Sequence, residues 1–292
     1  MEIIIASHSG LCYGVKRALT LAQQTRRRRT GRVMTLGELI HNPKVIADLK
    51  ALGLESVDDP AAVGEGTVVI RSHGVAPGVY QALKKRGIEV VDATCPIVKR
   101  IQQLVEGLAR RQADIVIVGD PAHPEIRGLL GCSRGRGRII ENEDQARRLS
   151  RRKNRAVLAQ STQDVLLFGR VVAALVERTE KLEVYNTICR STQTRQKATA
   201  DLAGRVDVLF IVGGRNSSNT HKLYELSKRI LPATYFIENA SQITPRLLKQ
   251  AKVVGISGGA STPPEAIAEA VAKIRNSFEH SLQRENRVQW QS

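Results

Sequence analysis

The sequence alternates short apolar runs with longer amphipathic stretches from one end to the other. Runs such as DIVIV at 114–118 and DVLFIV at 207–212 are short and rich in β-branched residues, which is typical of buried strands. Stretches such as 96–111 carry apolar residues at helical spacing. Strands that alternate with helices of this length need crossover connections, and these produce parallel sheet. The alternation therefore predicts an α/β fold.

The apolar runs give a set of expected strands, with helical patterns between most of them. The expected strands lie at residues 2–6, 32–36, 67–71, 88–92, 114–118, 138–140, 155–159, 182–185, 207–212, 233–237 and 252–257.

Three cysteines mark a coarse repetition along the chain. Cys12, Cys95 and Cys189 each precede or open an expected helix after a strand, and they are separated by similar lengths of sequence. This spacing predicts three similar α/β units with mostly parallel sheets, although sequence similarity between the units is too weak to establish a repeat. The expected units are residues 1–95, 96–187 and 188–280, followed by a polar, frayed tail at 281–292.

The net charge narrows the class of partner. The 292-residue chain has a formal charge of +17, much of it from arginine, which favours an anionic partner such as nucleic acid, a phosphorylated metabolite or an acidic protein. Aromatic residues make up only 3% of the chain, too few for a surface that stacks bases. Nucleic acid is therefore possible but not favoured.

Cysteine usage and hydropathy indicate the compartment. None of the four cysteines forms a CxxC pair, the first residues do not resemble a signal peptide, and no apolar stretch is long enough to span a membrane. We therefore expect reduced thiols, a cytoplasmic setting and no membrane association.

Reactive or hydrogen-bonding side chains follow nearly every expected strand. The carboxyl ends of parallel strands share one edge of a sheet, so these side chains can converge on one site. Taken singly, a histidine is more often a surface residue, and a serine or asparagine before a helix is more often only a cap. Their joint placement is what predicts a site. Besides the three cysteines, the set comprises His41, His73, His123, Glu125, Ser161, Ser217, Ser218, Asn219 and Ser261.

The residue types in this set favour particular chemistry. Three thiols from three units could hold zinc or iron, but zinc sites usually draw on closely spaced ligand pairs, which this sequence lacks. An iron–sulfur cluster with one iron that lacks a protein ligand suits three cysteines better. Histidines, hydroxyls and glycine-rich helix starts suit a diphosphate, and a nearby carboxylic acid could deliver protons. This combination predicts a reductase or dehydratase that acts on a small phosphorylated molecule.

Nine motifs, in order and spacing, resemble the 4-hydroxy-3-methylbut-2-enyl diphosphate reductase family, also called LytB or IspH. They are SGLCYGVKRAL, LIHNP, IRSHGV, DATCP, GDPAHPE, AQST, NTICRSTQTRQ, RNSSNT and GGAST. The resemblance extends from residue 3 to about residue 274. The resemblance implies three α/β units around a central 4Fe-4S cluster. It also implies reductive dehydroxylation of the substrate to isopentenyl and dimethylallyl diphosphate, the last step of the methylerythritol phosphate route to isoprenoids.

The resemblance also implies roles for individual residues. Cys12, Cys95 and Cys189 correspond to the ligands of a cluster that has one iron without a protein ligand, and Glu125 corresponds to the proton-delivering carboxylate. Ser161 stands near the substrate hydroxyl, where the family usually has threonine, and LCYG replaces the more common FCAG. The residues that correspond to diphosphate ligands are His41, His73, His123, Ser217, Ser218, Asn219 and Ser261.

Two further expectations complete this interpretation. Electrons would arrive one at a time from an acidic ferredoxin or flavodoxin, for which the basic surface is suited. Cys132 lies in GLLGCSRG, matches no motif, and is expected to be structural.

The alternative is a basic RNA- or ribosome-associated protein on a retained α/β scaffold, with vestigial thiols. It shares the fold and the charge with the reductase, but it predicts a colourless protein whose tight binding to RNA weakens with salt.

Overall fold

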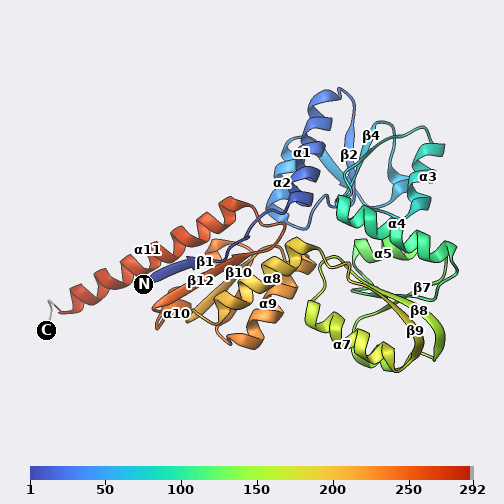
Figure 1. Cartoon of the computed structure of the whole chain (residues 1–292). Coiled ribbons are helices and arrows are strands. Elements are labelled where there is room, and N and C mark those ends of the chain that lie inside the picture. The colour runs from blue at the N-terminus through green and yellow to red at the C-terminus, as the bar shows by residue number, and fades with distance from the viewer. Residues whose placement is uncertain (290–292) are drawn as a thin grey trace. The chain divides into compact units, whose positions relative to one another are not determined.

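The structure is a computed structural model that describes residues 1–289, with side chains described for residues 1–278. The chain divides into two compact units, a smaller one of Met1–Cys12 with the chain from Thr194 onward, and a larger one of Tyr13–Gln193. Over the described residues the strands form three four-stranded sheets in which every pairing is parallel (Figure 1). The predicted α/β fold with parallel sheets is confirmed.

The first sheet of the larger unit has the strand order β3-β2-β4-β5. Its elements are α1 (Tyr13–Arg28), β2 (Val33–Leu36), α2 (Pro43–Ala51), β3 (Leu54–Val57), the 3₁₀ turn η1 (Pro60–Ala62), β4 (Thr67–Ile70), α3 (Pro77–Lys85) and β5 (Glu89–Asp92). Strand β3 is absent from the predicted strands. It is an edge strand whose sequence, LESV, buries only Leu54, so it lacks the apolar run of a central strand.

The second sheet of the larger unit has the strand order β7-β6-β8-β9. Its elements are α4 (Pro96–Arg110), β6 (Ile115–Val118), α5 (Pro124–Cys132), β7 (Gly137–Ile140), α6 (Glu143–Arg147), β8 (Arg152–Ala159), α7 (Val165–Val176) and β9 (Thr179–Tyr185). Alternate residues of β6 face opposite sides. Ile115 and Ile117 pack with residues of α4 and α5, whereas Val116 and Val118 pack with α7. Helices therefore cover both faces, as expected of a parallel sheet.

The third sheet lies in the smaller unit and has the strand order β1-β12-β10-β11. Its elements are β1 (Glu2–Ile5), α8 (Arg190–Ala203), β10 (Val208–Val212), α9 (Ser218–Ile230), β11 (Thr234–Ile237), the 3₁₀ turn η2 (Ala240–Gln242), α10 (Pro245–Leu248), β12 (Val253–Gly258) and α11 (Pro264–Gln289). Strand β1 pairs with β12, with Glu2 opposite Val253. The sheet expected in residues 1–95 therefore begins at β2, and the first strand of the chain belongs to the third sheet.

The three sheets share one topology when β1 is counted as the strand that follows β12. From one edge to the other, the orders are then β3-β2-β4-β5, β7-β6-β8-β9 and β11-β10-β12-β1. Each sheet thus has the same sequence of crossovers, and the chain start supplies the last strand of the third one. This similarity of topology accompanies the similar spacing of the cysteines.

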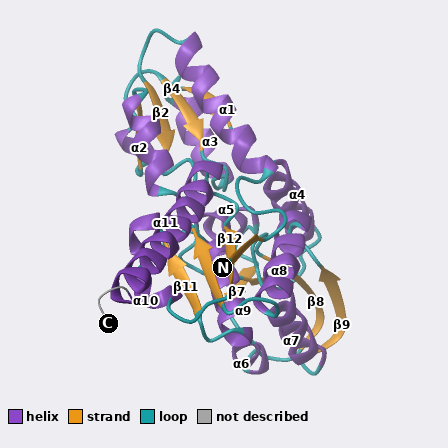
Figure 2. Ribbon diagram, turned by 90° about the vertical axis from the view of Figure 1, so that its left-hand side faces the viewer, coloured by secondary structure: helices purple, strands orange, loops and turns teal. Residues whose placement is uncertain are grey.

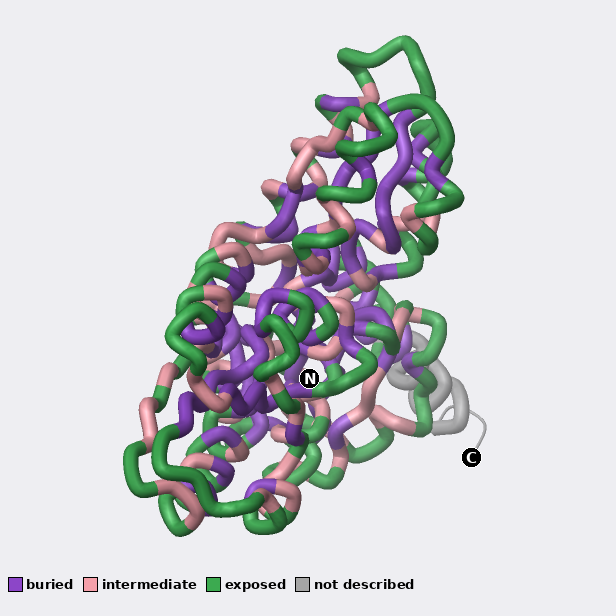
Figure 3. Tube along the Cα trace, turned by 90° about the vertical axis from the view of Figure 1, so that its right-hand side faces the viewer, coloured by how far each residue is buried: buried purple, intermediate pink, exposed green. Residues whose placement is uncertain are grey.

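The C-terminal helix differs from the expected frayed tail. Helix α11 continues to Gln289, while residues 290–292 of the expected tail lie outside the described residues. Ala270 and Ile274 of this helix pack in one cluster with Phe210 and Ile256 of the third sheet. Figure 2 shows α11 with strands β11 and β12 of this sheet. Buried residues are concentrated in the strands and the helix faces that cover them (Figure 3). Among the described residues, no helix combines the length and hydropathy needed to cross a membrane.

Candidate active site

The three predicted cysteine ligands occupy equivalent places in the three sheets. Cys12 lies between β1 and α1, Cys95 between β5 and α4, and Cys189 between β9 and α8. Strands β1, β5 and β9 are each an edge strand of their sheet. None of the three thiols is in a disulfide bond, and all three are half-buried. Each thiol therefore lies at the start of a helix, where negative charge is stabilised.

The backbone of each cysteine makes an equivalent hydrogen bond. The N–H donates to the carbonyl of a residue that follows the neighbouring strand, which is β4, β8 or β12. The bonds run from Cys95 N to Ser72 O at 2.9 Å, from Cys189 N to Ser161 O at 2.9 Å, and from Cys12 N to Ala260 O at 3.0 Å. The acceptor Ser72 precedes His73, and the acceptor Ala260 precedes Ser261. The third acceptor, Ser161, is itself a predicted site residue. In each sheet this bond joins a thiol-bearing segment to a segment that carries another predicted site residue.

Cys132 differs from the other three cysteines. It ends α5 and packs in the core of the second sheet with 5% of its surface exposed. Burial, assisted by the negative charge of Glu106, raises the pKa of its thiol to about 11. A thiol with such a pKa stays protonated at neutral pH and is a poor metal ligand. Its surroundings agree with the expected structural role.

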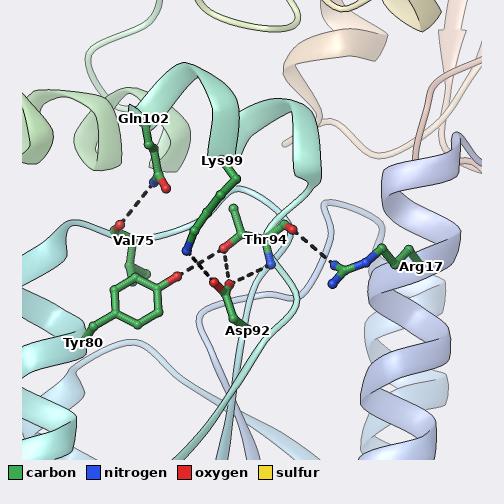
Figure 4. Close-up of polar contacts among 7 residues, drawn as sticks. All are labelled: Arg17, Val75, Tyr80, Asp92, Thr94, Lys99 and Gln102. Carbon is green, nitrogen blue, oxygen red and sulfur yellow. Dashed lines mark hydrogen bonds and ion pairs between the residues drawn. The ribbon is translucent and has the colours of Figure 1, made fainter. Parts of the chain in front are cut away.

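Polar contacts fix the segment that precedes Cys95 (Figure 4). The carboxylate of Asp92 accepts hydrogen bonds from Thr94 N at 3.0 Å and from Lys99 Nζ at 2.6 Å. Burial tends to raise the pKa of Asp92, but the hydrogen bonds from Lys99 and Thr94 outweigh this and lower it, so the carboxylate stays charged. Arg17 Nη1 donates to the Thr94 carbonyl at 3.2 Å, so α1 also supports this segment.

Three histidines meet at the strand ends of the larger unit. His41 follows β2, His73 follows β4 and His123 follows β6. The ring centroids of His41 and His73 are 4.4 Å apart in a stacked arrangement, and His123 lies 5.6 Å and 5.2 Å from them in edge-on contacts. Ring nitrogens of the three lie within 4.8 Å of one another, which by itself could suit a metal ion. The convergence expected of these histidines is present.

Burial keeps two of these imidazoles neutral. It is the main cause that lowers the pKa of His73 well below its usual value and the pKa of His123 to about 4, and the nearby imidazoles and Arg71 lower both further. His123 Nδ1 accepts the Glu125 N–H at 3.2 Å, so the proton of this neutral ring lies on Nε2. At neutral pH these rings therefore offer N–H donors without positive charge.

Glu125 is almost completely buried on the first turn of α5, with 1% of its surface exposed. Its Oε1 accepts from Ser161 N and its Oε2 from Ser161 Oγ, both at 2.6 Å. Burial raises the pKa of Glu125, and the two hydrogen bonds from Ser161 act in the opposite direction. Because Ser161 O also accepts the Cys189 N–H, one serine joins the buried carboxyl group to a thiol-bearing segment.

A second polar group lies in the smaller unit. Ser217, Ser218 and Asn219 form the start of α9, and Ser261 follows β12, with its Oγ 3.4 Å from Ser217 Oγ. Asn219 is buried, and neither Oδ1 nor Nδ2 has a hydrogen-bond partner among the described residues. Buried amide atoms without partners are unusual in proteins and point to a ligand that is bound in function. The serines also cap the helix, since Ser217 Oγ accepts the Thr220 N–H.

Each unit thus gathers its own share of the predicted residues. Those in the larger unit are His41, His73, Cys95, His123, Glu125, Ser161 and Cys189, and those in the smaller unit are Cys12, Ser217, Ser218, Asn219 and Ser261. Sequence reasoning missed Arg71, which lies two residues before His73. The positive charge of Arg71 acts on His73 and His123. The available signal was its position as the last residue of the predicted strand at 67–71, within IRSHGV.

Comparison with known proteins agrees with this arrangement. The family model described as LytB protein matches residues 3–275. The chain is 40% identical over 285 residues to the 4-hydroxy-3-methylbut-2-enyl diphosphate reductase of Aquifex aeolicus, covering 97% of this chain and 99% of that protein. It is 42% identical over 275 residues to the reductase of the same name from Citrifermentans bemidjiense, covering 94% and 97%.

Solved structures give the same relationship. A structure of (E)-4-hydroxy-3-methyl-but-2-enyl diphosphate reductase, described as the terminal enzyme of the non-mevalonate pathway, is 42% identical. The match has a TM-score of 0.67 and covers 94% of this chain and 100% of the chain in the solved structure. The corresponding reductase from Plasmodium falciparum, at 23% identity, has a TM-score of 0.87 and supports the fold alone. The chain therefore belongs to the LytB protein family.

Proposed function

We propose that this chain reduces 4-hydroxy-3-methylbut-2-enyl diphosphate to isopentenyl and dimethylallyl diphosphate. Curated relatives at about 40% identity over nearly the whole chain are named as this reductase, and none of those reported above is named as an RNA-binding protein. In the reaction, two electrons and two protons convert a C–OH bond to a C–H bond and release water. The site must therefore supply electrons, a proton donor and hydrogen-bonding groups that bind a diphosphate.

The proposed cofactor is one 4Fe-4S cluster held by Cys12, Cys95 and Cys189, with one iron that lacks a protein ligand. The donor set fits, because the three thiols are outside disulfide bonds, partly accessible and located at helix starts. The observation that carries the assignment is the equivalent backbone hydrogen bond of the three cysteines, which Cys132 lacks. When bound, such a cluster would supply single electrons and an open coordination position.

The chain's own residues would hold the substrate and move the proton. The neutral imidazoles of His73 and His123 would donate N–H groups to diphosphate oxygens, together with His41. In the smaller unit, the proposed diphosphate ligands are Ser217, Ser218, Asn219 and Ser261. Ser161 would lie near the substrate hydroxyl.

Glu125 is the proposed proton donor to the leaving hydroxyl. Its raised pKa keeps part of the carboxyl group protonated at a higher pH than an exposed glutamate, which is what a general acid requires.

The proposed electron donor is an acidic one-electron carrier, a ferredoxin or a flavodoxin. The net charge of +17 supports this choice, since complementary charge accelerates association between proteins.

Anaerobic purification of wild-type protein and four cysteine variants tests the proposal. Cys12→Ser, Cys95→Ser and Cys189→Ser should each lose most cluster absorbance and iron per chain, because iron in such clusters prefers thiolate to hydroxyl. Cys132→Ser is the matched control and should keep iron content and product formation near wild type. Iron loss in this control equal to that of the other three would refute the ligand assignment. A colourless wild-type protein with salt-sensitive RNA binding would favour the RNA-associated alternative.

A further inference from the structure

Arg71 lies at the histidine cluster, where its charge acts on His73 and His123. It directly follows β4, two residues before His73, and its Nε is buried with no hydrogen-bond partner among the described residues. Buried polar atoms are almost always satisfied in native proteins, by protein groups, by water or by a ligand. A guanidinium with a buried, unsatisfied N–H beside three imidazoles therefore points to a ligand that accepts hydrogen bonds.

The neighbouring strand makes room for this side chain. Gly37 follows β2, and a Cβ added there would lie 2.2 Å from Arg71 Nη1 and 2.9 Å from its Cζ. Gly37 also has a backbone φ of +71°, a value that residues other than glycine rarely adopt. The position that begins the segment leading to His41 is thus compatible with glycine alone while the guanidinium lies across it.

Arg71 stays protonated although its surroundings lower its pKa. Burial is the main cause that lowers the pKa of Arg71, and Arg127 lowers it further, whereas Asp58 and Glu38 raise it. An arginine keeps its proton throughout the range in which proteins are stable. Arg71 is therefore a permanent positive charge, whereas His73 and His123 are neutral at neutral pH.

This difference decides which kind of ligand the cluster suits. The three imidazoles could hold a divalent cation, but a fixed guanidinium charge close to them opposes a second positive charge. The same guanidinium favours an anion, and its planar fork matches phosphate oxygens.

We propose that Arg71 is an anion-binding residue of the diphosphate site, supplying the fixed positive charge that the neighbouring imidazoles lack. This assignment rests on the proposed function, because it takes the anion to be the substrate diphosphate. Arg71 interacts with the bound anion electrostatically and through guanidinium N–H groups, and its charge adds to the burial that keeps His73 and His123 neutral.

Binding of inorganic pyrophosphate to anaerobically purified holoprotein tests this proposal by calorimetry. Arg71→Gln should weaken binding about ten- to a hundredfold, the usual effect of losing hydrogen bonds from a charged group. It should also make binding less sensitive to salt. Arg71→Lys should recover part of the affinity, because it restores charge without the planar fork. The matched control is Arg147→Gln on α6, which removes an exposed arginine paired with Asp144 and should bind as wild type does.

A second readout separates an electrostatic role from a merely structural one. His123 faces His41, His73, Asp120 and Arg71. Removing the positive charge of Arg71 should raise the pKa of His123, measured by NMR titration of the imidazole C–H signals, whereas Arg71→Lys should raise it less.

The outcomes distinguish the two proposals. If wild-type protein does not bind pyrophosphate, the diphosphate site itself is wrong, and Arg71 with it. If wild type binds while Arg71→Gln binds equally well and leaves the His123 titration unchanged, the site stands and the role of Arg71 is refuted. If circular dichroism shows that Arg71→Gln folds poorly, the folded Arg71→Lys variant decides. Unchanged pyrophosphate affinity and unchanged salt sensitivity in Arg71→Lys would support a role of the positive charge alone. A pyrophosphate affinity as low as that of a His73→Ala variant would overturn the charge model.

Discussion

At the scale of the residue, Glu125 shows how burial sets chemistry. Its carboxyl group is excluded from water, and both oxygens accept hydrogen bonds from one residue, Ser161. Burial disfavours the ionised form, while the two hydrogen bonds favour it, and the net effect raises the pKa. A protonated carboxyl group can then persist toward neutral pH, where a proposed general acid has to act.

Replacing Glu125 by glutamine tests the acid without changing the shape of the site. The amide can accept the Ser161 N–H and donate to Ser161 Oγ, so the cluster should assemble and pyrophosphate should still bind. Turnover should fall by about two to four decades, the usual contribution of a positioned acid. Steady-state assays with cluster-loaded protein measure this, and near-normal turnover would return Glu125 to a structural role at the start of α5.

The same substitution should alter the pH dependence of stability. A carboxyl group whose pKa is raised on folding contributes stability that is complete below its unfolded pKa and is lost as the pH rises through the folded pKa. Wild type should therefore lose stability relative to Glu125→Gln as the pH rises above the usual glutamate range. Denaturant unfolding at several pH values measures the difference, and parallel curves for the two proteins would contradict the raised pKa.

At the scale of the element, two glycine-rich loops of the third sheet pack closely against buried threonines. The loop after β12 contains Gly259, and a Cβ added there would lie 2.0 Å from Thr220 Oγ1 and 3.2 Å from Thr220 Cβ. Thr220 is fully buried on the first turn of α9, next to Asn219. Glycine at this position thus lets the loop that carries Ser261 approach the helix that carries Asn219.

Gly259→Ala should therefore displace that helix start. Overpacking of a buried contact costs about 1–3 kcal/mol, and the shift should also weaken pyrophosphate binding because Ser217 and Asn219 move with the helix. Gly64→Ala is the matched control, since a Cβ at Gly64 would meet nothing within 4 Å. Thermal unfolding and calorimetry compare the two, and equal melting temperatures and affinities would show that the loop relaxes without cost.

Elements with continuous apolar runs could be predicted from sequence, whereas edge elements and partners could not. Strands β6 and β10, IVIV and VLFIV, are buried on both faces, so their composition identifies them. Strand β3 was missed because an edge strand need not be apolar. The predicted site residues were identified through their joint placement after expected strands and through their motifs. Arg71 was not, because an arginine at the end of a predicted strand is only a weak signal until its burial and its neighbours are known.

At the scale of the whole molecule, β1 completes a sheet whose other strands lie at the opposite end of the chain. No local feature of EIII specifies β12 as its partner, so the sequence pattern located the strand but not its sheet. The unit that we expected to start at residue 1 lacks it for this reason. Ala6 N also donates to Ile256 O at 2.8 Å, which extends the pairing beyond the strand.

A chain that lacks residues 2–5 tests the importance of this pairing. Removal exposes the hydrogen-bonding edge of β12 and uncovers apolar residues of the third sheet, so amides of β10 and β12 should lose protection against hydrogen exchange. Amides of β2 to β9 belong to the larger unit and should keep theirs, which makes them the internal control. Exchange measured by mass spectrometry reports both, and undiminished protection in β12 would show that the sheet is stable without β1.

The position of β1 also has a consequence for biosynthesis. Of the strands that the structure describes, β1 is translated before all the others and its partner β12 after all of them, so β1 has no sheet to join until β12 has emerged from the ribosome. The backbone hydrogen bond from Cys12 N to Ala260 O can form only after the residues around β12 have been translated. If Cys12 is a cluster ligand as proposed, we expect a cluster held by all three cysteines to assemble only once β12 has been translated.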